Sequence, residues 1–316
     1  MSTFPARARC GASNGGARAI RALSAAALAG VLACAPARPA GPPSAAPQTV
    51  MLEEMTWPEL RDAVRQGRTV AIVPIGGTEQ SGPALALGKH NARVRALCER
   101  IARELGNAVV APVVAYVPEG QIDPPTSHMR FPGTLSVPNS VFEATLEAAA
   151  RSLRAHGFRD IVLLGDHGGY QAQLGRVADR LDRAWAGAPA RVWAPDAYYE
   201  ASTHGFAALL REQGYRDDEI GTHAALSDTS LEMALAPQMV REDLLAPGTR
   251  FDASVGVYGG DPRRASAALG RMGADLIVSR SVSAIRQLVE HGRQAGTAPA
   301  MERARKDGQE NSQADP

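Results

Sequence analysis

The chain has 316 residues, with 34 Lys and Arg, 33 Asp and Glu, and 45% hydrophobic residues. Because the charges nearly balance, the composition offers no basic surface, and we expect no nucleic-acid partner. Of the three cysteines only Cys98 lies outside the first 50 residues, so the body of the chain cannot close an internal disulfide.

The first 37 residues have the order of an export signal. Several arginines between Arg7 and Arg21 precede "ALSAAALAGVLA" (22–33), an apolar run that is too short to span a bilayer. Two cleavage sites compete: "VLAC" resembles a lipoprotein box that would lipidate Cys34, whereas "APA" (35–37) has the small-x-small form of an ordinary signal-peptidase site. We therefore expect an exported protein, either periplasmic or lipid-anchored to the cell envelope.

Composition divides the rest of the chain into three parts. Residues 38–49 are rich in Pro and Ala, which is typical of a flexible linker. Residues 50–291 are long enough for one α/β domain. Residues 292–316 are polar without an apolar period, which predicts a disordered tail.

Within the domain, apolar β-branched runs alternate with segments of helical period. Four runs are predicted as buried strands and two segments as helices, the second capped by Asn139 and stopped by Gly157. In chain order, the strands are 69–75, 108–114, 160–165 and 190–195, and the helices are 91–106 and 140–157. This alternation favours a mostly parallel sheet with helices on both faces, a three-layer α/β/α fold.

Polar, glycine-rich turns follow two of the predicted strands. Glu79 follows the first strand, and "GDHGG" (165–169), which contains His167, follows the third. Ligands of parallel sheets collect at the carboxyl ends of the strands, so we expect both turns at one edge. Taken singly, His167 is better explained as a loop histidine bonded to backbone.

Five blocks resemble the creatininase family, in order along the domain. They are "MTWPELRDAVRQGRTVAIVPIGGTEQSGPALALG" (55–88), "HMRFPGTLSV" (128–137), "LLGDHGGY" (163–170), "HAALSDTSLEMAL" (223–235) and "GVYGGDPRRASAALG" (256–270). The resemblance implies a creatininase-like fold, metal-dependent hydrolysis of a small-molecule amide, and a homo-oligomer.

The site residues implied by the resemblance are partly altered. In the family pattern a Glu and a His each bind one of two metals, and an Asp bridges them. Glu79 is retained, whereas Ser81 stands at the His position and His90 at the Asp position. The ligand His167 is retained, and so is His223, which resembles a catalytic residue.

The altered positions predict one metal ion instead of two. A further family carboxylate has become the shorter Asp228, and a neutral imidazole offers one lone pair and cannot bridge two ions. Two imidazoles and two carboxylates still suit a single divalent ion, zinc, with manganese or iron as alternatives. The predicted ligands are Glu79, His90, His167 and Asp228.

The predicted function is hydrolysis of a non-peptide C–N bond, in an amide that we expect to be cyclic. The metal would polarise the carbonyl and activate water, and His223 would carry a proton to the leaving nitrogen. His128 either orients the substrate or packs as a loop histidine. The alternative is an exported, non-catalytic protein that binds a small ligand in the same cleft.

Overall fold

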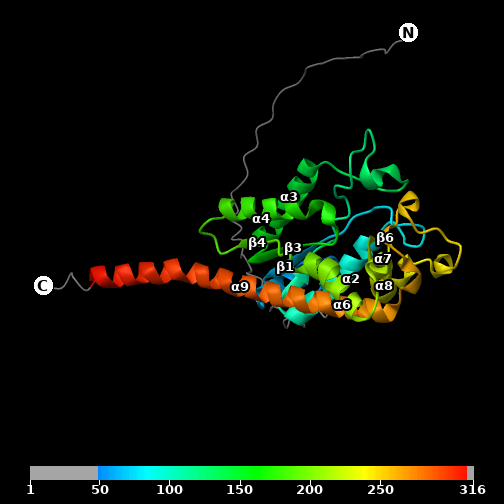
Figure 1. Ribbon diagram of the computed structural model, residues 1–316. Coiled ribbons are helices and arrows are strands. Elements are labelled where there is room, and N and C mark those ends of the chain that lie inside the picture. The colour runs from blue at the N-terminus through cyan, green and yellow to red at the C-terminus, as the bar shows by residue number, and fades with distance from the viewer. Residues whose placement is uncertain (1–48, 312–316) are drawn as a thin grey trace, which may run out of the picture. The chain divides into compact units, whose positions relative to one another are not determined.

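The computed structural model describes residues 49–311, with side chains as far as Arg293 (Figure 1). The predicted leader, the lipidation candidate Cys34 and the linker up to residue 48 lie outside the described residues. In the part that is described, no helix is both long enough and apolar enough to cross a membrane.

A four-stranded sheet forms the centre of the domain. Its strands are β1 (Val70–Ile75), β2 (Ala108–Val110), β3 (Asp160–Gly165) and β4 (Arg191–Trp193). They are all parallel and lie in the order β2-β1-β3-β4, which confirms the predicted sheet. β2 is shorter than the predicted 108–114, because Pro112 lacks the N–H that a continuing ladder needs.

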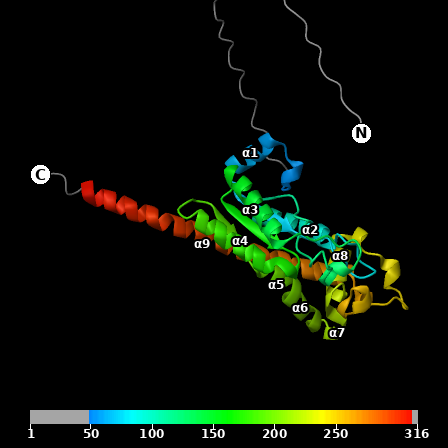
Figure 2. The same ribbon diagram turned by 90° about the horizontal axis from the view of Figure 1, so that it is seen from above.

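Helices cover both faces of this sheet. Along β1, Ala71, Val73 and Ile75 pack against α3 (Asn139–Ala155) and α4 (Gln171–Ala184). The alternate residues Val70 and Ile72 pack against α2 (Lys89–Leu105) and α9 (Ala267–Asn311). Seen from above, α3 and α4 lie over the sheet and α9 passes behind it (Figure 2). The three-layer prediction is confirmed.

Shorter elements complete the domain. They are α1 (Trp57–Arg65), α5 (Ala197–Glu200), α6 (Phe206–Glu212), α7 (Asp217–Ile220) and α8 (Leu226–Leu235), with β5 (Gly221–His223) and β6 (Tyr258–Gly260) as an antiparallel pair. β5 leads into α8, so His223 and the first turn of α8 are held close together.

The predicted ends of two helices need correction. The cap of α3 is Pro138, one residue before the predicted Asn139, whose side-chain oxygen instead accepts a hydrogen bond from Gln173. Gly157 follows this helix with a φ of +98°, as a stop residue does. The predicted tail from residue 292 is helical as far as Asn311. The tail has no periodic pattern of apolar residues, which predicts that it buries no helix face. Its Ala, Glu, Arg and Lys residues nevertheless favour a helix.

Candidate metal centre

The carboxyl ends of the strands bring the predicted turns together. β1 ends at Ile75 and is followed by Glu79, and β3 ends at Gly165 and is followed by His167. The Nε2 atom of His167 lies 3.2 Å from Oε2 of Glu79. The two turns, about ninety residues apart in sequence, therefore meet at one sheet edge, as predicted.

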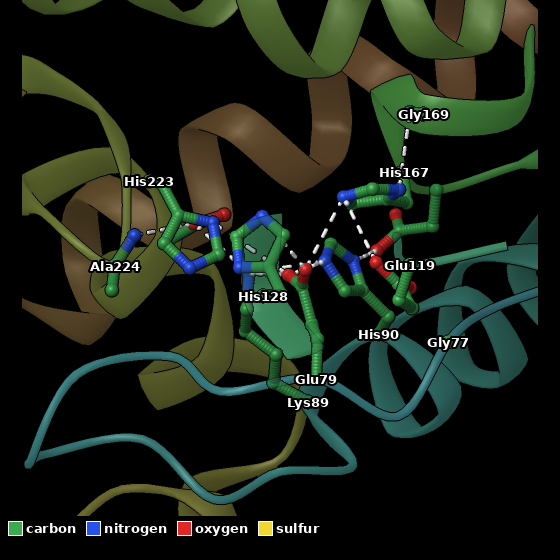
Figure 3. Close-up of polar contacts among 12 residues, drawn as sticks. Gly77, Glu79, Lys89, His90, Glu119, His128, His167, Gly169, His223 and Ala224 are labelled. Atoms are coloured by element: carbon green, nitrogen blue, oxygen red, sulfur yellow. Dashed lines mark hydrogen bonds and ion pairs between the residues drawn. The ribbon is translucent and has the colours of Figure 1, made fainter. Parts of the chain in front are cut away.

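Four side chains at this edge could hold a metal ion. One ligand atom from each of Glu79, Glu119, His128 and His167 lies within 4.8 Å of all the others. Glu119 and His128 come from the long loop between β2 and α3. Figure 3 shows these side chains turned toward one another. We call these four residues the metal group.

The chemistry of the metal group fits a divalent cation. It offers two carboxylates and two imidazoles, a donor set that suits zinc. Both carboxylate oxygens of Glu119 are buried and form no hydrogen bond within the described residues, and the buried Oε2 of Glu79 is contacted by the imidazoles of His167 and His128 at 3.2 and 3.3 Å. Burial and the neighbouring charge of Glu79 raise the pKa of Glu119 to about 9. A cation would satisfy these oxygens and expel the Glu119 proton.

Local backbone holds His167 in its place. Its Nδ1 accepts a hydrogen bond from the Gly169 N–H at 3.1 Å, so Nε2 carries the ring hydrogen and faces Glu79 and Glu119. Binding of a metal ion through Nε2 requires this hydrogen to move to Nδ1. A Cβ at position 169 would lie 2.8 Å from the imidazole, and one at position 168 would lie 2.4 Å from the Tyr199 hydroxyl. The two glycines are therefore required by these close approaches.

A second set of charged side chains adjoins the metal group. Lys89, His90 and Arg93 come from the first two turns of α2, Asp166 follows β3, and Asp228 lies in the first turn of α8. We call these five residues the paired cluster. They connect to the metal group through the other oxygen of Glu79, Oε1, which lies 2.7 Å from His90 Nε2 and 3.5 Å from Lys89 Nζ.

The structure places His90 and Asp228, both predicted as ligands, in this paired cluster. The second nitrogen of His90, Nδ1, is hydrogen-bonded to Oδ2 of Asp166 at 2.5 Å. Asp228 accepts from Lys89 at 3.0 Å and from Arg93 at 2.8 Å. Of the four predicted ligands, Glu79 and His167 belong to the metal group, whereas the nitrogens of His90 and the oxygens of Asp228 are already engaged.

The pKa values of the paired cluster show how completely its charges are matched. Burial favours the neutral form of His90, but Glu79 and Asp166 outweigh it and raise its pKa. Burial likewise opposes ionisation of Asp228, yet Lys89 and Arg93 hold its pKa well below the usual range. Each charge is stabilised by an opposite charge in contact.

His223, the predicted catalytic residue, faces Glu79 from the end of β5. Its Nε2 lies 3.0 Å from the backbone oxygen of Gln80, an acceptor, and 3.2 Å from the side-chain amide nitrogen of Gln80, a donor. We assign the hydrogen to Nε2 on the shorter contact. Nδ1 is then the lone-pair nitrogen, 3.6 Å from Glu79 Oε1. Burial and the Lys89 charge lower the pKa of His223 to about 3. The ring is therefore neutral and able to accept a proton.

His128, the predicted substrate-binding residue, lies in the metal group. Its Nε2 is 3.3 Å from Glu79 Oε2, and its Nδ1 is 3.0 Å from the amide nitrogen of Gln80. The orientation of that amide is fixed because its oxygen accepts from the Gly82 N–H. Burial lowers the pKa of His128, which keeps its ring neutral. Because Nδ1 accepts from the Gln80 amide, the ring hydrogen is on Nε2, and binding of a metal ion through Nε2 requires this hydrogen to move to Nδ1.

A polar cavity of about 200 Å³ lies against both groups. Its wall includes Lys89, Arg93, His128, His167, Tyr199 and His223. The cavity therefore gives a small molecule access to the metal group on one side and to the neutral His223 on another.

Two residues of the candidate site, Glu119 and Lys89, escaped the sequence prediction. Glu119 lies in a loop rich in Pro and Gly with no periodicity, so the sequence does not indicate a role for it. Only the structure shows that it lies close to His167. Lys89 begins a helix, where lysine is usually a solvated residue. Its one sequence signal is the absence of acidic residues from the first turn of α2, which leaves that turn basic.

Comparison with known proteins gives a consistent result. The family model described as creatininase, creatinine amidohydrolase, matches residues 53–285. Creatinine amidohydrolase of Pseudomonas putida is 27% identical over 202 residues, 62% of this chain and 75% of that protein. The mycofactocin precursor peptide peptidase of Mycolicibacterium smegmatis is 29% identical over 218 residues, 66% of this chain and 81% of that protein.

Solved structures agree with these matches. The crystal structure of creatinine amidohydrolase superposes with a TM-score of 0.64 at 25% identity, covering 77% of this chain and 99% of the other. A manganese creatininase gives a TM-score of 0.63 at 25% identity with the same coverage. A mutant creatininase described as Zn-Zn type also gives 0.63, at 26% identity and again with the same coverage.

Proposed function

Because the chain belongs to the creatininase family of hydrolases, we propose that it hydrolyses a non-peptide amide bond in a small molecule with one divalent metal ion. The observation that carries the proposal is the metal group, in which ligand atoms of two carboxylates and two imidazoles lie within 4.8 Å of one another and both buried oxygens of Glu119 have no hydrogen-bond partner in the described chain. This ligand set replaces the predicted His90 and Asp228 with Glu119 and His128.

The bound ion would polarise the substrate carbonyl and lower the pKa of a water molecule. Zinc is the first choice for this donor set, with manganese or iron as alternatives. Manganese and zinc both occur in the descriptions of the similar creatininase structures, which supports this choice.

The chain's own residues would handle the protons. The lone pair at Nδ1 of His223 can accept a proton, and the resulting imidazolium can pass it to the departing nitrogen. Glu79 Oε1, 3.6 Å away, stabilises that imidazolium by its charge. The hydrogen bond from Nε2 to the Gln80 carbonyl favours the tautomer that leaves Nδ1 free.

The size of the cavity supports a small substrate. About 200 Å³ is below the roughly 300–1,000 Å³ of typical ligand pockets. The similar mutant creatininase that is described as complexed with creatine binds a molecule of this class. The cavity volume and this complex support a compact, polar small molecule, and within that class we propose a cyclic amide.

A substrate panel tests the function. The zinc-loaded protein would be incubated with five- and six-membered cyclic amides, linear amides and a short peptide, and products followed by NMR. We expect turnover of a cyclic amide, loss of turnover after chelation, and a 10²- to 10⁴-fold lower kcat for His223→Asn with unchanged metal content. A metal-loaded protein that binds these amides and cleaves none would favour the non-catalytic binding protein.

We also propose export, on the basis of the sequence order in residues 7–37. The mature protein would begin at Cys34, with a lipid anchor, or after residue 37. Mass analysis of the mature N-terminus distinguishes these outcomes, and an intact Met1 in the cell envelope or periplasm would contradict both.

A further inference from the structure

Lys89 is an unusual lysine because its side chain is completely buried at the wall of the polar cavity. Three atoms from different parts of the chain surround its Nζ. Asp228 Oδ2 lies at 3.0 Å, His90 Nε2 at 3.1 Å and Glu79 Oε1 at 3.5 Å. Figure 3 shows Lys89 beside Glu79 and close to His90.

Nothing local explains a buried lysine at this position. The first turn of a helix repels positive charge, and α2 has no acidic residue there. Burying an ammonium is also costly unless anions compensate for the lost water. The compensating carboxylates are Glu79, from the turn after β1, and Asp228, from the first turn of α8. The tertiary fold therefore assembles an anionic position that Lys89 fills.

The surroundings of this ammonium match those of a metal ion. Two carboxylate oxygens, Glu79 Oε1 and Asp228 Oδ2, converge on a single point, and carboxylate is a ligand type of zinc and manganese. The imidazole of His90 borders the same point, with its Nε2 engaged by Glu79. Glu79 is common to both positions, since Oε1 faces Lys89 and Oε2 belongs to the metal group. Two cation positions thus share one carboxylate, a bridging arrangement found in two-metal sites.

We propose that the Lys89 ammonium is a built-in cation that occupies a second cation position beside the metal group and excludes a second metal ion. The inference rests on the proposed function in one respect, because it takes the metal group as the first position. An ion coordinated by Glu79 Oε1 and Asp228 Oδ2 would have to overlap with Nζ, and its charge would be repelled by the ammonium.

The proposal predicts that removal of Lys89 creates a second metal site. In Lys89→Ala the loss of the side chain leaves Glu79, His90 and Asp228 facing an open position. We expect zinc bound after dialysis to rise from about one ion per chain in the unaltered protein to about two in the variant. Elemental analysis and titration calorimetry measure this directly.

Two control variants separate this effect from a general loss of charge. Arg100→Ala removes a cation from the same helix, where Arg100 forms an exposed ion pair with Asp275. Lys89→Arg keeps a cation in the paired cluster. Both should bind the same number of ions as the unaltered protein.

A second variant, measured with and without added zinc, tests the proposal in case Lys89→Ala does not fold. Lys89→Gln also removes the charge but keeps an amide that can donate to Asp228. We expect its melting temperature to rise with added zinc more than that of the unaltered protein, because a second ion binds only the folded state. Failure of both variants to fold at any zinc concentration would overturn the proposal, since a divalent ion should replace the ammonium.

The measured stoichiometries distinguish this inference from the proposed function. One ion in the unaltered protein and one in folded Lys89→Ala overturns the role of Lys89 alone. If the unaltered protein binds no ion and Lys89→Ala binds one, the metal group is not a metal site, but the second cation position is supported. Two ions in the unaltered protein show that Lys89 does not exclude a metal.

Discussion

The two oxygens of Glu79 face two regions in which buried negative charge is balanced in different ways. On the Oε1 side, in the paired cluster, Lys89 and Arg93 neutralise carboxylates contributed by the chain itself. On the Oε2 side, in the metal group, no lysine or arginine approaches within ion-pair distance in the described chain, and Glu119 instead has its pKa raised to about 9 by burial and by Glu79. One region is complete without a ligand, and the other is balanced only by a proton or a cation.

Exposure does not separate the two regions. The side chains of His90 and Arg93 are 4% exposed and those of His128 and His167 are 14% exposed, but Asp228 of the paired cluster is 16% exposed. Members of both regions line the same polar cavity. The difference lies in charge: the carboxylate of Glu119 has no lysine or arginine in contact in the described chain, and such an unpaired ligand is suited to bind a cation from solution.

Glu79→Gln should have the largest effect because Glu79 belongs to both regions. Loss of its charge removes a ligand from the metal group, and metal affinity should fall by at least about 100-fold. The same change leaves Lys89 and His90 short of a buried anion, and the free energy of unfolding should fall by about 3–5 kcal/mol. Elemental analysis and urea unfolding measure the two effects separately. Full metal content in the folded variant would show that Glu79 is not a ligand.

Arg93→Met should separate the two regions. Arg93 donates to Asp166 and Asp228 but contacts no member of the metal group in the described structure. Its loss leaves both carboxylates with one cation fewer, and stability should fall by about 3–5 kcal/mol. Metal bound per folded molecule should stay near one. A loss of metal equal to that of Glu79→Gln would mean that the two regions do not act independently.

Glu119→Gln should affect stability and metal binding in opposite directions. The pKa of Glu119 is raised from 4.5 to about 9 by folding, so the folded state holds a proton that the unfolded state releases. Its contribution to stability is therefore complete below about pH 4.5 and is lost as the pH rises toward 9. In chelator, the variant should exceed the unaltered protein at pH 8 by about 1–3 kcal/mol and match it near pH 4.5.

Metal binding by the same variant gives the second half of this test. The amide cannot supply the carboxylate charge, so zinc affinity should fall by about 10- to 100-fold at pH 8. Urea unfolding in chelator and zinc titration use the same samples. A variant that is less stable than the unaltered protein at pH 8 would show that Glu119 is ionised and well paired without metal.

The buried strands could be predicted from the sequence because their apolar residues follow a regular pattern. The runs at 70–75 and 161–164 are apolar throughout, as strands covered on both faces must be. Parallel pairing then places Glu79 and His167 at one edge by a general rule of such sheets. The fold and half of the metal group follow from these local regularities.

Pairings between distant side chains could not be predicted in this way. The role of Lys89 depends on Asp228, which lies 139 residues further along the chain. Glu119 reaches His167 from a loop without periodicity. Neither contact leaves a local pattern, because it depends on where loops and helix ends lie in three dimensions. The change of His90 from a predicted ligand to an ion-paired residue has the same origin, since Asp166 engages its second nitrogen.

Ser81→Ala should have the smallest effect, and it tests whether the metal group extends to position 81. Ser81 is buried, and its hydroxyl forms no hydrogen bond within the described residues. Deleting an unsatisfied hydroxyl should change stability by less than about 1 kcal/mol, toward a more stable protein, and leave metal content unchanged. The matched control is Ser136→Ala, which removes a hydroxyl bonded to Glu119 N–H and Gly120 O and should cost about 1–2 kcal/mol. A fall in bound zinc for Ser81→Ala would extend the metal group to position 81.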